Sequence, residues 1–323
     1  MNSFDDLIGQ EQAVQLLQQA GRRDRIATAY LFYGAAGIGR SMAASSFTQL
    51  VLTKGLSPEK QLAAQKKLQT GNHPDLRWIE PTYLYRGKSI TVQEAAELGL
   101  QRKTPPKIHI EQIRDLIQFL NRPPLEAQRQ VAVIEDAQTM GEAPANALLK
   151  TLEEPERATL ILIAPNTDSL LPTLVSRCQQ VQFFPLSQAN LKSVLNHNGY
   201  AEILNHPELL TIAQGSPGSA IASWKTLQTI PPDLLPELQQ LPKPPLEAIA
   251  LAKTIDRELD ITTQLWLVDY LQSYFWQRNY QSEMVKQWEK TRHYLLSYVQ
   301  PRLVWECMLL EEVEGDKVTR SSK

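Results

Sequence analysis

A glycine-rich turn near the N-terminus constrains the fold more than any other feature of this 323-residue sequence. Residues 34–41 read Gly-Ala-Ala-Gly-Ile-Gly-Arg-Ser; they follow the short aromatic and aliphatic run Tyr30–Tyr33 and precede a helix-like segment. Glycines at positions Gly34, Gly37 and Gly39 let the backbone turn several N–H groups toward one anion, and the positive end of the next helix adds attraction. This strand–turn–helix context predicts a phosphate-binding loop of the P-loop NTPase type. The alternative is an ordinary glycine-rich turn.

One position of the loop departs from the pattern. Such loops carry a Lys before the Ser or Thr that holds Mg²⁺, whereas this sequence has Arg40 before Ser41. Arginine is a planar fork and lysine a compact point charge, so the exchange is not conservative in a tight phosphate cradle. We expect a degenerate site whose backbone still allows ATP and Mg²⁺ to bind, while efficient hydrolysis is lost.

The composition excludes several classes of protein. With 33 basic and 35 acidic residues the net charge is −2, which argues against a surface dedicated to coating nucleic acid but leaves room for a local basic strip. Two cysteines, Cys178 and Cys307, are too few for a four-cysteine zinc site and fit free thiols in a reducing compartment. The N-terminus does not read as a signal peptide, and no apolar run approaches the roughly 18 residues of a membrane span. We expect a soluble, cytoplasmic protein without membrane contact.

The first 185 residues alternate strand-like runs with helix-like segments, which is the pattern of a parallel α/β sheet. An amphipathic helix is predicted where Ile113, Leu116, Ile117 and Leu120 recur at helical spacing. Residues 42–52 are predicted as the helix that follows the glycine-rich loop. The candidate strands are Tyr30–Tyr33, Leu76–Ile79, Val131–Ile134, Leu160–Ile163 and Val181–Phe184.

Helical spacing replaces this alternation after Pro185, where Ser187 is a candidate helix cap. The proline-rich stretch 231–245 predicts a linker, and Pro301 predicts the first turn of a last helix. Large aromatic residues that would build a separate helical core are Trp266, Trp276, Trp288 and Trp305. The predicted domains are an α/β core at 1–185, a small helical lid at 186–225, an all-α C-terminal domain at 226–315 and a disordered tail at 316–323.

Acidic and amide side chains follow two of the predicted strands. Glu135 and Asp136 come after Val131–Ile134, where NTPases place the acid that holds Mg²⁺ and the base that orients water. The usual order is Asp then Glu; the reversed order favours a decayed catalytic site over an ordinary acidic strand end. Asn166 follows Leu160–Ile163 and would orient an attacking water, although an Asn in a turn is common.

Two further segments carry little information alone. Asn146–Pro155 predicts an amphipathic helix that ends at its proline. Ser176-Arg177-Cys178 follows a short helical segment and precedes a predicted strand. An arginine in that place is by default a surface salt-bridge partner.

Taken together, four segments resemble the clamp-loader AAA+ family, and within it the delta-prime subunits of bacterial DNA polymerase III: Phe4–Gln10, 34–41, Asn146–Pro155 and Ser176–Cys178. The resemblance covers residues 1 to about 220 and the remainder only by its helical character. It implies an AAA+ core, a helical lid and a C-terminal domain that oligomerises in a collar. The implied partners are gamma/tau motor subunits and a delta subunit, with the sliding clamp and primed DNA reached through the complex. Arg177 would be an arginine finger for the ATP site of a neighbouring motor subunit.

The sequence departs from the family pattern at three places. The phosphate-loop Lys is missing, which fits delta-prime subunits better than motor subunits. Gly71–Asp75 is retained, but 51–72 has no Cys or His, so no zinc is expected and His73 is read as a loop residue. Gly215–Ala220 resembles the nucleotide sensor of the lid without its arginine.

These departures predict a stator, whose own ATPase activity is absent or weak and which has no intrinsic nucleotidyl transfer. The alternatives are an active gamma/tau-type motor or another AAA+ remodeller, and a pure scaffold. The segment 81–107 is predicted to be a long irregular loop that contacts DNA or a neighbouring subunit, or else is simply solvated. Its basic residues are Arg86, Lys88, Arg102, Lys103 and Lys107.

Overall fold

The computed structural model describes residues 4–100, 104–153, 158–240, 244–278, 282–297 and 299–320. The chain divides into two compact units, with the boundary between Asn190 and Leu191. Every helix in the described ranges is too short or too polar to cross a lipid bilayer.

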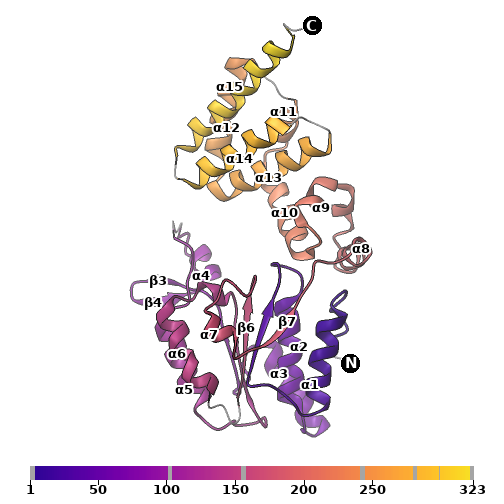
Figure 1. Cartoon of the computed structure of the whole chain (residues 1–323), viewed down its shortest axis with the longest axis vertical. Coiled ribbons are helices and arrows are strands. Elements are labelled where there is room, and N and C mark those ends of the chain that lie inside the picture. The colour runs from indigo at the N-terminus through magenta and orange to yellow at the C-terminus, as the bar shows by residue number, and fades with distance from the viewer. Residues whose placement is uncertain are drawn as a thin grey trace. The chain divides into compact units, whose positions relative to one another are not determined.

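A five-stranded parallel sheet forms the centre of the first unit, in the order β2-β5-β6-β1-β7 (Figure 1). The three inner strands are buried almost throughout, because helices cover both faces of the sheet, whereas the edge strands β2 and β7 are partly exposed. This arrangement confirms the predicted α/β fold class. The strand bounds are β1 Ala29–Tyr33, β2 Leu76–Ile79, β5 Gln130–Ile134, β6 Ala158–Ala164 and β7 Gln179–Gln182.

Only the last predicted strand, Val181–Phe184, is misplaced. β7 begins two residues earlier because the edge strand starts with Gln179 and Gln180, which are exposed and carry no apolar pattern.

Helices α1–α3 lie on one side of the sheet, and α5 and α6 lie on the other (Figure 1). The predicted stripe on α5 is confirmed, since Ile113 and Leu116 are fully buried in one cluster with Leu148 of α6. Burying each such side chain contributes about 1.5–3 kcal/mol. The helices of this unit are α1 Glu11–Arg22, α2 Arg40–Thr53, α3 Pro58–Gln69, α4 Val92–Glu97, α5 Ile110–Leu120, the 3-10 helix η1 Ala137–Thr139, α6 Glu142–Glu153 and α7 Pro172–Val175.

The segment 81–107 is not the irregular loop that the sequence predicts. It contains an antiparallel hairpin of β3 (Tyr83–Tyr85) and β4 (Lys88–Ile90), followed by α4. The hairpin turn has positive φ at both central residues, Arg86 (49°) and Gly87 (78°), as the type I′ turn of a two-residue hairpin requires. Arginine is an unusual residue at such a position, so the turn was hard to foresee. Arg102 and Lys103 lie outside the described residues.

The second unit is all helical. The Ser187 hydroxyl accepts the N–H of Asn190 at 3.2 Å, which confirms the predicted cap of α8. The predicted aromatic core is confirmed at Trp288 and Trp305, which are fully buried, but is wrong at Trp276, which is 63% exposed. The elements are α8 Gln188–His197, the 3-10 helix η2 Ala201–Asn205, α9 Pro207–Ala213, α10 Pro217–Thr229, α11 Leu234–Leu238, α12 Pro245–Glu258, α13 Ile261–Gln277, α14 Ser282–Leu296 and α15 Pro301–Arg320.

The proline-rich stretch is not only a linker, because α11 lies inside it and buries Leu234 and Leu238. Helices of the predicted lid pack against the C-terminal helices, most extensively α9 against α13, within one compact unit. Helix α15 starts at Pro301, as predicted, and continues to Arg320, into the segment predicted as a tail. Residues 321–323 lie outside the described residues.

Candidate functional site

The glycine-rich loop lies between β1 and α2, in the predicted strand–turn–helix context. Its three glycines have positive φ: Gly34 (148°), Gly37 (73°) and Gly39 (105°). A Cβ on Gly34 would stand 2.5 Å from the carbonyl oxygen of Phe183, so only glycine fits there. Gly39 ends the loop as the residue before the first turn of α2. The backbone therefore keeps the shape of an anion-binding turn at a helix N-terminus.

Gln10 fixes this loop to the segment that follows β7. Its side chain is 3% exposed; the amide nitrogen donates to the carbonyl oxygens of Ile38 (3.1 Å) and Phe184 (2.7 Å). Its amide oxygen accepts the N–H of Phe184 at 3.1 Å. Gln10 belongs to Phe4–Gln10, one of the segments that resemble the clamp-loader family. Its structural role could not be predicted from that segment, because its partners lie 28 and 174 residues away in the sequence.

Arg40, which replaces the usual Lys, is turned into the protein. The side chain is 7% exposed, and its guanidinium donates to the carbonyl oxygen of Ala164 at the end of β6. Burial lowers the pKa of Arg40 from its ordinary value, and the nearby carboxylates of Asp136 and Glu135 oppose this shift. Both acids are thus close enough to balance its charge. The Arg40 guanidinium, which would have to bind a phosphate, instead interacts with groups of the protein itself.

Ser41 and Glu135 are bonded to each other. The Ser41 hydroxyl donates to one carboxylate oxygen of Glu135, and the indole N–H of Trp78 donates to the other at 3.0 Å. These are the hydroxyl and the acid that the sequence assigned to Mg²⁺. Trp78 was not predicted as a site residue; it reaches Glu135 because β2 and β5 are neighbours in the sheet, with Trp78 in register with Val133.

Asp136 and Asn166 take up turn positions. Asp136 has φ 47°, and its carboxylate accepts the side-chain amide of Gln138 at 3.2 Å. The side-chain oxygen of Asn166 accepts the N–H of Ser169 at 2.8 Å. The structure therefore brings Arg40, Ser41, Glu135 and Asp136 together, whereas the oxygen of Asn166 is used in its own turn.

The arrangement fits a nucleotide only in part. The loop backbone fits a phosphate, since its glycines leave the N-terminus of α2 open to an anion. The side chains fit an active Mg²⁺–ATP site poorly, because Arg40 is bonded to Ala164 and Ser41 is bonded to Glu135. Whether nucleotide binds here stays a prediction.

Arg177 lies apart from this loop. It precedes β7, whose first residue, Gln179, is in register with Tyr30 near the start of β1, whereas the loop leaves the end of β1 at Tyr33. The two sites thus lie toward opposite ends of parallel strands. Arg177 is exposed, and one guanidinium N–H donates to the carbonyl oxygen of Thr173 at 3.0 Å.

The short helix α7 holds Arg177 at the surface. Leu174 is fully buried, and the backbone N–H of Arg177 donates to its carbonyl oxygen at 3.1 Å. The next residue, Cys178, is partly buried, and burial raises the pKa of its thiol to about 12. Leu174 and Cys178 pack against the core before and after Arg177 and fix its backbone, while the Arg177 residue itself is exposed.

His73 is buried, and its Nδ1 accepts the N–H of Asp75 at 3.1 Å. Burial is the main reason that the pKa of His73 is lowered. No group of three or more His, Cys, Asp or Glu side chains in the described ranges is arranged to hold a metal ion. Gly215–Ala220 forms the start of α10, where the Ser216 hydroxyl accepts the N–H of Ser219 at 3.1 Å.

Two family models together match most of the chain. The model described as "DNA polymerase III, delta subunit" matches residues 9–187, and that described as "Cyanobacterial DNA polymerase III delta prime, C-terminal domain" matches residues 189–312. The first alone covers more than half of the sequence.

Curated relatives agree with this result. DNA polymerase III subunit delta' of Pseudomonas aeruginosa is 36% identical over 212 residues, covering 64% of this chain and 58% of that protein. Subunit delta' of Bacillus subtilis is 31% identical over 180 residues, covering 55% and 48%. The matches therefore span only about half the length of these relatives.

Among solved structures, a DNA polymerase III gamma subunit-related protein from Thermotoga maritima has the same fold, with a TM-score of 0.55 and 18% identity over 92% of this chain and 98% of that one. The fold, the glycine-rich loop and the family matches lead to one assignment. This chain belongs to the delta-prime family of DNA polymerase III subunits.

Proposed function

We propose that this chain is a stator subunit of the clamp loader of a bacterial DNA polymerase III holoenzyme, and that it supplies Arg177 to the ATP site of a neighbouring motor subunit. The observation that carries the proposal is the placement of Arg177. It is exposed and fixed by α7, and it lies toward the opposite end of the strands from the loop of its own chain. An arginine so placed serves a site on another subunit more readily than its own.

The loop at 34–41 contributes no turnover in this proposal. Mg²⁺ would have to replace the Ser41–Glu135 hydrogen bond, and Arg40 would have to leave the carbonyl oxygen of Ala164. Both steps remove a buried or half-buried polar group from its partner, which costs about 1–3 kcal/mol for each group. ATP would at most occupy the backbone cradle without being hydrolysed.

The partners in this proposal are a gamma/tau motor subunit and a delta subunit, in a cytoplasmic complex that opens the sliding clamp and places it on primed DNA. Family membership supports this set, because the relatives are named as DNA polymerase III subunits. In the neighbour's site, Arg177 would stabilise the charge that develops on the transferred phosphoryl group. Such an arginine is worth about 10³–10⁵ in rate where it has been removed from NTPases.

The test is ATP hydrolysis by the complex reconstituted from motor, delta and this chain, with clamp and primed DNA. We expect Arg177→Ala to lower hydrolysis roughly tenfold or more while assembly, measured by size-exclusion chromatography, is unchanged. Arg114→Ala is the matched control, since Arg114 is also exposed in the first unit but lies on α5. Equal hydrolysis by both variants would make the chain a scaffold. Turnover by the isolated chain that Glu135→Ala abolishes would make it a motor.

A further inference from the structure

The outer edge of β2 has unpaired backbone groups. Asp75 and Ile79 point their carbonyl oxygens toward β5, where they accept N–H groups at 2.9 and 2.8 Å. Alternate residues of a strand point the opposite way. The carbonyl oxygen of Glu80 accordingly accepts the side-chain amide of Gln112 at 3.1 Å on the outer side.

Thr82 lies on the same outer side and exchanges two backbone hydrogen bonds with Lys107, at 2.9 and 3.0 Å. By this alternation, the outward groups that remain are the C=O of Leu76, the N–H and C=O of Trp78 and the N–H of Glu80. None of them has a hydrogen-bond partner among the described residues. The chain therefore pairs the segment after β2 at Thr82 and leaves the outer edge of β2 itself without backbone partners in the described part of the chain.

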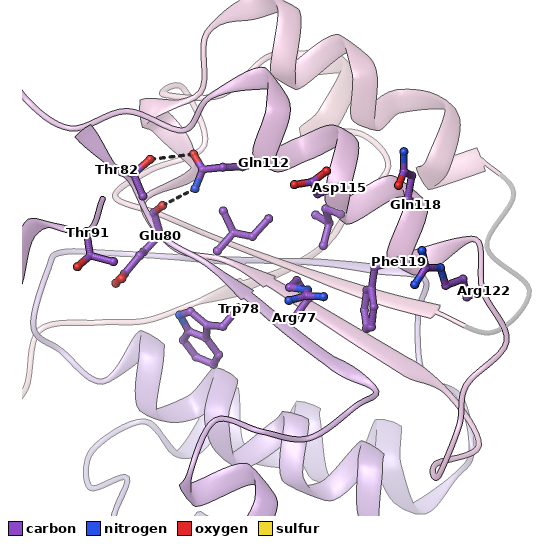
Figure 2. A pocket seen from close by; sticks show the side chains of 12 residues that line it. Arg77, Trp78, Glu80, Thr82, Thr91, Gln112, Asp115, Gln118, Phe119 and Arg122 are labelled. Carbon is purple, nitrogen blue, oxygen red and sulfur yellow. Dashed lines mark hydrogen bonds between the residues drawn. The ribbon is translucent and has the colours of Figure 1, made fainter. Parts of the chain in front are cut away.

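A cavity of about 460 Å³ lies beside this open stretch (Figure 2). Both Arg77 and Trp78 line it, although successive side chains of a strand point to opposite faces of the sheet. The run of consecutive lining residues, Arg77 to Glu80, places the cavity along the edge of β2. Its other wall is α5, which contributes Gln112, Asp115 and Phe119 among others.

The two ends of the cavity differ in charge. Figure 2 shows Arg77 and Arg122 beside the ring of Phe119 at one end, with the Arg77 guanidinium 5.3 Å from the ring centroid. Neither arginine forms a salt bridge within the described part of the chain. At the other end lie Glu80 and the hydrogen-bonded pair Gln112 and Thr82. Asp115 projects from α5 between these ends.

We propose that this edge is a docking site for an extended segment of a partner protein, which adds as a strand to β2 and places an acidic side chain against Arg77 and Arg122. Main-chain hydrogen bonds to Trp78 and Glu80 would provide the attachment, as in other cases of strand addition to a sheet edge. The arginine pair would set the direction and the preference for an acidic segment. An open sheet edge without such an occupant is a liability that proteins normally cover.

The test uses the full chain and three synthetic heptapeptides. The acidic probe is acetyl-Glu-Val-Glu-Val-Thr-Val-Thr-amide, and the basic probe has Lys in place of Glu. The third is the acidic probe with its amides N-methylated, which removes its N–H donors and places methyl groups where the strand edges would have to meet. Binding is followed by titration calorimetry and by amide hydrogen exchange of the isotopically labelled chain.

We expect the acidic probe to bind about tenfold more tightly than the basic probe and the N-methylated probe not to bind. The bound acidic probe should slow exchange at the amides of Trp78 and Glu80. The amides of Arg77 and Ile79 serve as internal controls, because they point toward β5 and are already paired in the sheet. No binding of any probe, or equal binding of the N-methylated probe, would overturn the proposal.

The double variant Arg77→Ala/Arg122→Ala separates the charge from the backbone. It should lose the preference for the acidic probe, because Glu80 and Asp115 remain beside the edge, while a bound probe still protects the amide of Trp78. An unchanged preference would contradict the assigned role of the arginines. Since no ATP and no motor subunit is present, a negative result here leaves the proposal for Arg177 untouched.

Discussion

The sharpest structural prediction concerns Asp75, which joins β2 to the loop before β5. Its carboxylate is fully buried and accepts three backbone N–H groups, from Leu125 (2.6 Å), Glu126 (2.7 Å) and Ala127 (2.7 Å). A hydrogen bond to a charged group contributes about 1.5–3 kcal/mol net, so three such bonds set an upper range of roughly 4.5–9 kcal/mol. Leu125 is 77% exposed, so water can replace part of what is lost.

We therefore expect Asp75→Ala to lower the free energy of unfolding of the first unit by about 3–5 kcal/mol. Asp75→Asn should cost less, because its amide oxygen still accepts, although its NH₂ group faces N–H donors. The exposed Asp115→Ala is the control and should change stability by less than about 0.5 kcal/mol.

The assay is urea unfolding combined with amide hydrogen exchange, because two compact units do not guarantee a single two-state transition. Exchange at Leu125, Glu126 and Ala127 should accelerate in both Asp75 variants. If Asp75→Ala costs less than about 1 kcal/mol, or these three amides stay protected, the carboxylate does not hold the loop as described.

Three further predictions can be checked on the isolated chain. At pH 8 iodoacetamide should alkylate the exposed Cys307 and spare Cys178, because the raised pKa of Cys178, about 12, lowers its thiolate fraction roughly a thousandfold. Peptide mass spectrometry with and without denaturant measures the labelling of each cysteine. Equal labelling of the two in the folded protein would contradict the prediction. Gln10→Ala should lower the free energy of unfolding by about 2–4 kcal/mol, because backbone groups of Ile38 and Phe184 lose their hydrogen-bond partner. An unchanged midpoint of urea unfolding would refute this role. Burial raises the pKa of Asp269 against the opposing effect of Arg292, so the folded state holds this proton more tightly than the unfolded state. The contribution of Asp269 to the free energy of unfolding should therefore fall as the pH rises from the ordinary carboxyl pKa to the raised one. Urea midpoints measured between about pH 3.5 and 6 should show this pH dependence, and Asp269→Asn should remove it.

The inner strands could be predicted because burial on both faces demands continuous apolar runs, as in Leu160–Ile163. The hairpin β3–β4 could not, because its strands are short and largely exposed and its turn begins with Arg86 at positive φ. Trp276 was assigned to the core because α13 is apolar on several sides, and only the packing of its neighbours decides which side faces solvent.

The sequence predicted which residues belong to the candidate site, but not which hydrogen bonds they form. Glycine spacing located the loop, and the strand that ends at Ile134 located the acids. The bonds of Arg40 to Ala164 and of Trp78 to Glu135 depend on strand order and register, which local pattern does not specify. The loop has the shape of a phosphate-binding loop, but because of these hydrogen bonds the side chains of the site are engaged by the protein.

The central claim is that Arg177 completes one active site on a neighbouring subunit, and a pre-steady-state count of hydrolysed ATP tests it most directly. The reconstituted complex, loaded with ATP, is mixed with clamp and primed DNA, and the burst of phosphate per complex is measured by rapid quench. With Arg177→Ala, the account predicts a single-turnover burst smaller by the contribution of one site. Steady-state hydrolysis falls roughly tenfold or more because each further cycle waits for that slow site. An unchanged burst, with the same rate at every site, would contradict it.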